Sequence, residues 1–301
     1  MSDPSYLELY RSGELSSRIE RLHRILESCE LCPRKCRVNR LAGQRGFCKS
    51  GKELMVSSYG PHFGEEPELV GRHGSGTIFL TNCNLLCVYC QNYDISHLGY
   101  GEGVSTERTA TMMLGLQDMG CHNINFVTPT HYAPQLVQAT GKAAERGLRL
   151  PIVWNCGGYE NVEVIRLLEG IVDIYMPDIK YSSPEPADKY SRAPDYFDRC
   201  KEAVREMHRQ VGELKVDNRR IAYTGLLIRH LVLTNDLAGS QSVLDFISDE
   251  LSNDTYVNIM DQYRPCGEAE EYKELSRRTS HAEYRKAVDY AQSIGLHRGF
   301  R

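Results

Sequence analysis

The sequence has no run of 18 apolar residues, no internal repeat and no low-complexity linker. A membrane-spanning helix is therefore not expected. Its N-terminal stretch alternates charged and apolar residues and has no signal-peptide core, so we expect a cytoplasmic protein without a membrane partner. The formal net charge of −4 gives no overall basic bias, which makes a nucleic-acid partner unexpected.

One short cysteine motif lacks a fourth member. The stretch TNCNLLCVYCQN places Cys83, Cys87 and Cys90 in a C-x3-C-x2-C spacing with no further cysteine nearby. Three thiolates on one loop can hold three corners of a cubane iron–sulfur cluster, and a missing fourth ligand leaves one iron open for chemistry. The alternatives are a zinc knuckle completed by a distant cysteine, or three ordinary buried thiols.

A second group of cysteines is complete. Cys29, Cys32, Cys36 and Cys48 form a C-x2-C-x3-C-x11-C arrangement within a stretch rich in Arg and Lys. Four thiols supply a closed shell, which suits structural zinc or a fully ligated iron–sulfur cluster, and the spacing alone does not choose between them. A metal-free segment, in which the thiols stay reduced, is the other alternative.

The order of the expected elements predicts the fold class. Apolar runs indicate strands at 76–81, 123–128, 149–155, 171–176, 226–233 and 255–260, with helices near 105–119, 133–147, 160–169, 195–211 and 238–252. Apolar spacing within residues 5–28 adds an N-terminal helix. Alternating strands and helices predict a parallel sheet, either a partial barrel or a doubly wound open sheet. In both, sites gather at the carboxyl ends of the strands.

The polar residues that follow these strands are the candidate binding residues. Asp178 and Lys180 would share one face after the fourth strand and could hold a zwitterionic amino acid, or form a surface ion pair. Arg229 and His230 must face opposite sides of the fifth strand, with a ligand carboxylate, Asp173 or Asp178 as partners for the arginine. Thr128 and Thr130 end the second strand, where a capping role for Thr130 is equally open. Asn155 precedes a Gly157–Gly158 pair that would admit an adenosine or form a plain turn.

The cysteine motif, with Tyr89 just before its last cysteine, resembles the cluster motif of the radical S-adenosylmethionine (SAM) superfamily. The branch it resembles most is the PflX-type, related to pyruvate formate-lyase-activating enzyme. Further stretches in the expected order are HNINFVTPTHY, VDIYMPDIKY, LLIRHLVL and YVNIMDQY.

The resemblance implies a partial (β/α)6 barrel in residues 71–301, preceded in 1–70 by the N-terminal helix and the four-cysteine segment. It also implies a 4Fe-4S cluster on Cys83, Cys87 and Cys90, with SAM on the open iron. Reductive cleavage of SAM would release methionine and a 5′-deoxyadenosyl radical that abstracts a hydrogen atom, with reduced flavodoxin or ferredoxin as the expected electron donor. The residues expected around SAM are Tyr89, Asn92, Thr128, Thr130, Asn155, Asp178, Lys180 and Arg229.

Two departures from the activases bear on the substrate. The Gly-Gly-Glu-Pro stretch that binds the SAM amino group in many activases is replaced by Thr128, Thr130 and His131. The additional cysteines precede the SAM motif instead of following it. The position of these cysteines argues against activation of a glycyl-radical partner, and the source of the hydrogen atom is left as either a protein glycine or a small molecule. A non-catalytic zinc or iron–sulfur protein, serving electron transfer or partner binding, is the alternative from a different class.

Overall fold

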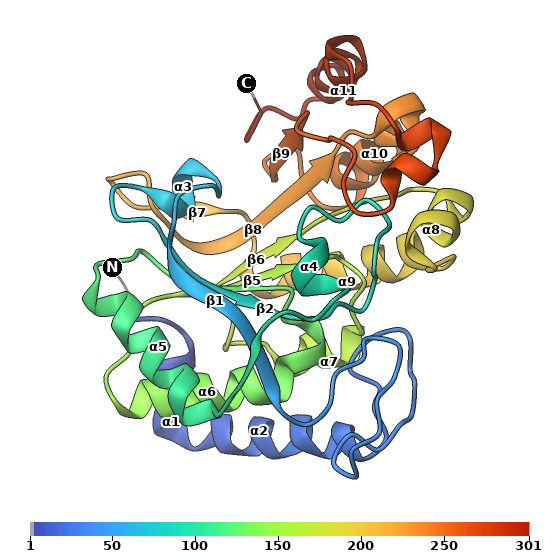
Figure 1. The fold of residues 1–301 in the computed structure, drawn as a ribbon. Helices are drawn as coiled ribbons and strands as arrows, with labels where there is room; N and C mark the ends of the chain where they lie inside the picture. The colour runs from blue at the N-terminus through green and yellow to red at the C-terminus, as the bar shows by residue number, and fades with distance from the viewer. Residues whose placement is uncertain (1–2, 301) are drawn as a thin grey trace.

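The computed structural model describes residues 3–300, and its centre is a nine-stranded sheet (Figure 1). Six neighbouring strands run parallel in the order β2, β4, β5, β6, β8 and β9. Their bounds are Ser75–Leu80, Ile124–Val127, Ile152–Cys156, Ile174–Pro177, Ala222–Leu231 and Tyr256–Met260. All six lie within or next to the strands expected from the sequence. Strands β2, β4, β5 and β6 are almost entirely buried on both faces, which explains their central place, whereas β9 alternates buried and partly exposed residues.

The sheet does not close, so the partial barrel is confirmed. Strand β8 pairs with β6 through Gly225 and Leu226, and with β9 from Leu227 onward. At the other edge, β1 (Leu54–His62) runs antiparallel to β2, and β3 (Glu102–Val104) covers the outer side of β1. A short β7 (Lys215–Val216) lies antiparallel to the start of β8.

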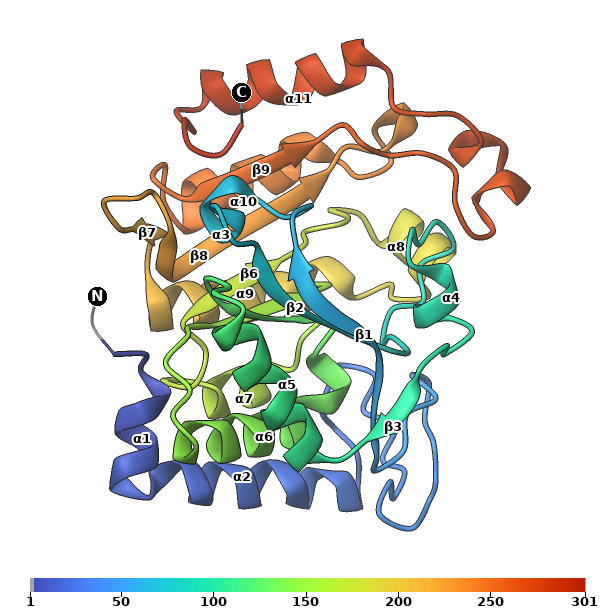
Figure 2. The same cartoon turned by 60° about the vertical axis from the view of Figure 1, so that its left-hand side comes forward.

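Helices pack around the outside of the sheet, and five of them match expectation. These are α5 (Thr106–Asp118), α6 (Ala133–Glu145), α7 (Val162–Leu167), α9 (Tyr196–Val211) and α10 (Ser240–Glu250). The short helices that the sequence did not indicate are α3 (Pro67–Val70), α4 (Tyr93–Ser96) and α8 (Pro184–Ser191). A longer one, α11 (His281–Ser293), lies beside α10 and β9 (Figure 2).

The N-terminal helix differs from expectation because it is two helices. The first, α1, spans Tyr6–Ser12, and α2 spans Glu14–Arg24, with Gly13 between them at a φ of +79°. That left-handed conformation favours glycine and ends the first helix. Both helices pack on α6 at the outside of the sheet (Figure 2). No helix among residues 3–300 combines the length and apolarity needed to cross a membrane.

Candidate functional site

A cavity of about 350 Å³ opens at the carboxyl ends of the parallel strands. Loops after β2, β4, β5 and β6 line it, together with the end of β8 and the loop after β1. Strand ends of this kind are where parallel α/β proteins place their ligands. The wall contains both the three-cysteine loop and a cluster of charged side chains.

The three-cysteine loop begins directly after β2. Cys83, Cys87 and Cys90 all line the cavity, and the loop needs left-handed backbone at Asn82 (φ +66°) and Leu86 (φ +54°) to turn so sharply. Helix α4 follows the last cysteine and closes this part of the wall through Ile95 and Ser96.

Each of these sulfur atoms has a hydrogen-bond donor. The backbone N–H of Leu85 donates to Cys83 Sγ at 3.3 Å, and the Ser191 hydroxyl donates to Cys87 Sγ at 2.9 Å. The Ser96 hydroxyl lies 3.2 Å from Cys90 Sγ. Donors directed at sulfur stabilise a thiolate more than a thiol, so the loop is built to hold anionic sulfur.

Asp178 joins two cations of the cavity wall, Arg229 and Lys180. Its Oδ1 accepts from Arg229 Nε and its Oδ2 from Lys180 Nζ, each at 2.7 Å. The Arg229 guanidinium also reaches Glu65 at 3.1 Å and the Asn155 side-chain oxygen at 2.8 Å. Burial alone would raise the pKa of Asp178, but Arg229 and Lys180 hold it below its usual value. This carboxylate is therefore ionised at neutral pH.

The strand register explains how these residues meet. Asp178 follows β6 and forms a parallel bridge with Arg229 of β8, so both side chains arrive at the same edge of the sheet. His230, the next residue, faces the other way and bonds Ser240 of α10 at 2.9 Å. Of the partners weighed for Arg229 from the sequence, Asp178 is bound. Asp173 lies before β6 and accepts from Ser5 and Ile152 instead.

Seven of the eight residues expected around SAM line this one cavity. These are Tyr89, Asn92, Thr128, Asn155, Asp178, Lys180 and Arg229. Thr130 does not, since it is buried and its hydroxyl donates to Glu160. His131 is also buried elsewhere, with Nε2 at 2.9 Å from the Thr81 carbonyl oxygen.

Glu65 is a cavity residue that the sequence reasoning missed. It follows β1, a strand that was not expected, and its carboxylate contacts both Arg229 and Asn155. Burial raises the pKa of Glu65, and the positive charge of Arg229 opposes that rise. The sequence signal was the acidic pair Glu65–Glu66 before Pro67, a residue that suits the first turn of a helix.

The model of the family described as Radical SAM superfamily matches residues 77–225, a span that includes the three-cysteine loop, Asp178 and Lys180. An uncharacterized protein of Methanocaldococcus jannaschii, MJ0674, is 33% identical over 300 residues, which cover 96% of this chain and 82% of that protein. The chain belongs to the radical SAM superfamily. Membership of this family implies a 4Fe-4S cluster and SAM as cofactors, and it supports a SAM-cleaving radical enzyme in general terms. The narrower PflX-type branch stays a prediction.

Two solved structures are similar to this chain at low sequence identity. A radical SAM methyltransferase from Sphaerobacter thermophilus is 11% identical, with a TM-score of 0.47 over 75% of this chain and 66% of that chain. Methylornithine synthase is 16% identical, with a TM-score of 0.49 over 74% of this chain and 63% of that chain. The radical SAM chain described here thus spans just under two thirds of each of them.

The cysteine loop fits the cluster that the superfamily implies. Burial raises the pKa of Cys83 to about 12, and it also raises that of Cys87. Such thiols stay protonated unless a metal stabilises their thiolates. All three sulfur atoms belong to the wall of one cavity and each has a hydrogen-bond donor, so the loop can supply three ligands to one cluster.

The four-cysteine segment packs beside this loop (Figures 1 and 2). Cys29, Cys32 and Cys48 are buried, while Cys36 is partly exposed. The backbone N–H of Arg37 donates to the Cys29 carbonyl at 2.9 Å. The N–H of Phe47 lies 3.4 Å from Cys36 Sγ, so the fold brings the distant Cys48 next to the other three. No comparison shows a metal here, and the predicted second metal remains a proposal.

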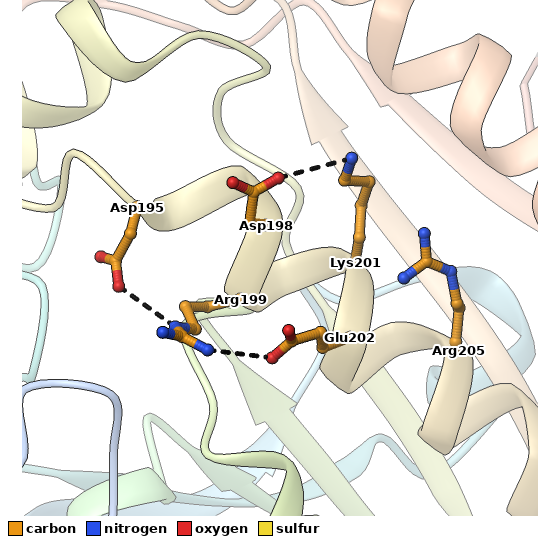
Figure 3. Close-up of a pocket in the computed structure, with 6 residues that line it drawn as sticks. All are labelled: Asp195, Asp198, Arg199, Lys201, Glu202 and Arg205. Carbon is orange, nitrogen blue, oxygen red and sulfur yellow. Dashed lines mark hydrogen bonds and ion pairs between the residues drawn. The ribbon is translucent and has the colours of Figure 1, made fainter.

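A second hollow lies on the outer face of α9 and has a different character (Figure 3). Its wall consists of charged side chains of α9 together with Asp195, the residue just before that helix. Arg199 pairs with Asp195 at 3.1 Å and with Glu202 at 3.2 Å, and Lys201 lies 3.5 Å from Asp198. Opposite charges that alternate along a solvated helix face satisfy one another, so this hollow is a surface ion-pair network.

Proposed function

We propose that the cavity at the strand ends binds a 4Fe-4S cluster on Cys83, Cys87 and Cys90 together with SAM, and that the protein abstracts a hydrogen atom from a substrate. The observation that carries this proposal is that the cysteine loop and the charged residues line the same cavity. The three thiols and the charged group of Asp178, Lys180 and Arg229 line one cavity of about 350 Å³. That volume lies within the range of small-molecule sites.

The charged group suits the amino-acid part of SAM. Lys180 Nζ uses one of its three N–H groups on Asp178, which leaves two for a ligand carboxylate. The Asp178 oxygens each accept one hydrogen bond and keep a lone pair for a ligand ammonium. Arg229 already contacts Asp178, Glu65 and Asn155, so its main role is to hold these acceptors in place.

Other polar residues would support the bound SAM. Asn155 and Thr128 offer polar groups at the ends of β5 and β4, and Tyr89 and Asn92 belong to the cysteine loop. Thr130 has a structural part, since it bonds Glu160 in the core. When bound, the cluster supplies the electron that cleaves SAM to methionine and a 5′-deoxyadenosyl radical, which takes the hydrogen atom. Apolar side chains such as Leu85, Val127 and Leu231 limit water around that reaction.

The substrate class is left at two alternatives, a protein glycine and a small molecule. The cysteine order argues against a glycyl-radical partner, because the additional cysteines precede the three-cysteine motif. Stimulation of turnover by candidate substrates would separate the two.

The test is release of 5′-deoxyadenosine by protein reconstituted with iron and sulfide under anaerobic conditions, then supplied with SAM and dithionite. Replacement of Cys83, Cys87 and Cys90 by alanine should abolish that release and remove the corresponding iron. Cys121→Ala is the matched control, because Cys121 is a buried cysteine outside both cysteine groups. Deoxyadenosine release that survives the triple replacement would refute the proposal. A protein that holds zinc without sulfide and does not bind SAM would favour a non-catalytic role.

A further inference from the structure

The four-cysteine segment is bound directly to the three-cysteine loop. Arg34, inside the CPRKC stretch, donates from Nε to the Asn84 carbonyl oxygen at 3.0 Å. Its other nitrogens donate to the carbonyls of Ser191, at 2.8 Å, and Arg192. Asn84 is the neighbour of Cys83, and the Ser191 hydroxyl is the donor to Cys87 Sγ. The Arg34 guanidinium therefore joins the four-cysteine segment to the three-cysteine loop itself, at Asn84, and to Ser191, which contacts that loop.

A separate chain of contacts reaches the third cysteine. Lys49, next to Cys48, donates to the His97 carbonyl at 3.3 Å. The His97 ring lies 2.8 Å from the Ser96 hydroxyl, which in turn lies 3.2 Å from Cys90 Sγ. The two cysteine groups are thus linked by two independent polar routes.

The charges around the four-cysteine segment suit an anionic centre. Residues 31–49 contain six Lys and Arg and no Asp or Glu, although the whole chain has a net charge of −4. Arg40 is buried, and its guanidinium donates to the carbonyls of Gly51 and His131, with no carboxylate partner among residues 3–300. A buried cation without a counter-charge is costly. Four thiolates around an iron–sulfur core carry a net negative charge, which would supply it.

The two cysteine groups offer their sulfur atoms similar hydrogen-bond donors. A donated N–H on Cys36 Sγ, from Phe47, repeats the feature found at each sulfur of the other loop. Zinc has no redox chemistry, so of the two metals only an iron–sulfur cluster could use the polar routes to the other cysteine loop for electron transfer.

We propose that Cys29, Cys32, Cys36 and Cys48 hold a second iron–sulfur cluster that relays single electrons from an acidic electron-transfer protein to the cluster on Cys83, Cys87 and Cys90. This inference rests on the proposed function. In each relay event the reduced donor loses one electron, the second cluster accepts and releases it, and the first cluster is reduced by one electron. No bond forms or breaks, and the donor is a reduced one-electron carrier of the flavodoxin or ferredoxin class.

The docking surface for that donor is the basic rim of the segment. Lys35, Arg37, Arg45 and Lys49 are all exposed around the partly exposed Cys36. Arg37 pairs with Glu30 at 2.8 Å, while the rim as a whole stays positive. An acidic carrier would be steered to this rim, and its association would weaken as salt rises.

The first test counts metal. Anaerobically reconstituted protein should contain about eight iron and eight sulfide per chain, as two cubane clusters require. The variant C83A/C87A/C90A should keep about half of each, and so should C29A/C32A, with an electron paramagnetic resonance signal from one reduced cluster in either case. Cys121→Ala should match the wild type. Zinc in C83A/C87A/C90A, or no metal at all, would overturn the proposal.

The second test separates relay from simple metal content. Deoxyadenosine formation is measured with dithionite and with reduced flavodoxin, and the ratio of the flavodoxin-driven to the dithionite-driven rate is compared. We expect that ratio to fall at least about tenfold in K35E/R45E, which keeps all four cysteines, because charge reversal repels an acidic carrier. A ratio equal to that of the wild type, at normal metal content, would overturn the relay. Absence of deoxyadenosine with both reductants in the wild type would instead sink the proposed function and leave the metal count standing.

Discussion

Asp178→Asn tests how the charged group of the cavity binds SAM. The replacement keeps the size of the side chain and removes its negative charge. Lys180 then loses its 2.7 Å ion pair, while Arg229 keeps its contacts with Glu65 and Asn155. In the proposed complex, the ligand ammonium also loses its charged acceptor. We therefore expect weaker SAM binding through both effects.

The size of the effect follows from the charged hydrogen bonds that the replacement removes. A hydrogen bond to a charged group contributes about 1.5–3 kcal/mol, and roughly 1.4 kcal/mol corresponds to a factor of ten in affinity. Asp178 and Lys180 are each 19% exposed at the side chain, so solvent screens part of this energy. We expect the SAM dissociation constant to rise about 10- to 100-fold on this basis. Equilibrium dialysis of the cluster-loaded protein with labelled SAM measures it.

Asp173→Asn is the matched control for that experiment. Asp173 precedes β6 as Asp178 follows it, but Asp173 is buried and bonds Ser5 and Ile152 outside the cavity, whereas Asp178 is partly exposed and lines it. Its replacement should lower the midpoint of thermal unfolding and leave SAM affinity within about twofold. An unchanged SAM dissociation constant in the folded Asp178→Asn protein would refute the assignment of this charged group to SAM. Equal losses in both variants would refute it too.

Three further predictions concern stability and the cluster. Burial raises the pKa of Glu160 to about 7. The folded state therefore binds more protons than the unfolded state between about pH 4.5 and 7, so the free energy of unfolding should fall by about 3 kcal/mol as the pH rises through that window. Urea titrations at several pH values should show that Glu160→Gln removes this dependence. Ser191→Ala removes the hydroxyl donor to Cys87 Sγ and should lower the reduction potential of the cluster in an electron paramagnetic resonance titration. Gly158 and Gly147 both have a positive φ, but only at Gly158 would an added Cβ lie 2.4 Å from a backbone oxygen, that of Asp178. Gly158→Ala should therefore lower the free energy of unfolding by at least about 1 kcal/mol more than Gly147→Ala.

The parallel strands could be predicted because their signal is local. Apolar runs such as those of β4 (Ile124–Val127) and β5 (Ile152–Cys156) are buried on both faces, so no pairing information is needed to find them. Strand β1 could not be found in this way. It mixes buried and exposed positions, bulges between Val56 and Ser58, and contains Pro61 near its end. Glu65 was missed with it, since its place in the cavity depends on how β1 pairs with β2.

Contacts between residues far apart in the sequence could be predicted only in part. Opposite directions for Arg229 and His230 follow from strand geometry, and the structure confirms them. The choice between Asp173 and Asp178 as partner of Arg229 depends on the register of β6 against β8, which the sequence does not encode locally. The packing of the four-cysteine segment on the other cysteine loop likewise depends on tertiary contacts, whereas the helix break at Gly13 is a local effect of its left-handed backbone.

Lys180 links the charged group of the cavity to the cysteine loop. Burial raises the pKa of the Cys87 thiol, and the positive charge of Lys180 is the largest opposing influence. The same ammonium pairs with Asp178, which in turn holds Arg229. A one-electron change at the cysteine loop would therefore alter the field at the residues proposed to bind SAM. Because coupling between two sites is reciprocal, SAM binding must shift the cluster potential by the free energy with which reduction shifts SAM affinity. Asp178→Asn should reduce both shifts together, since it removes the charge that connects Lys180 to Arg229.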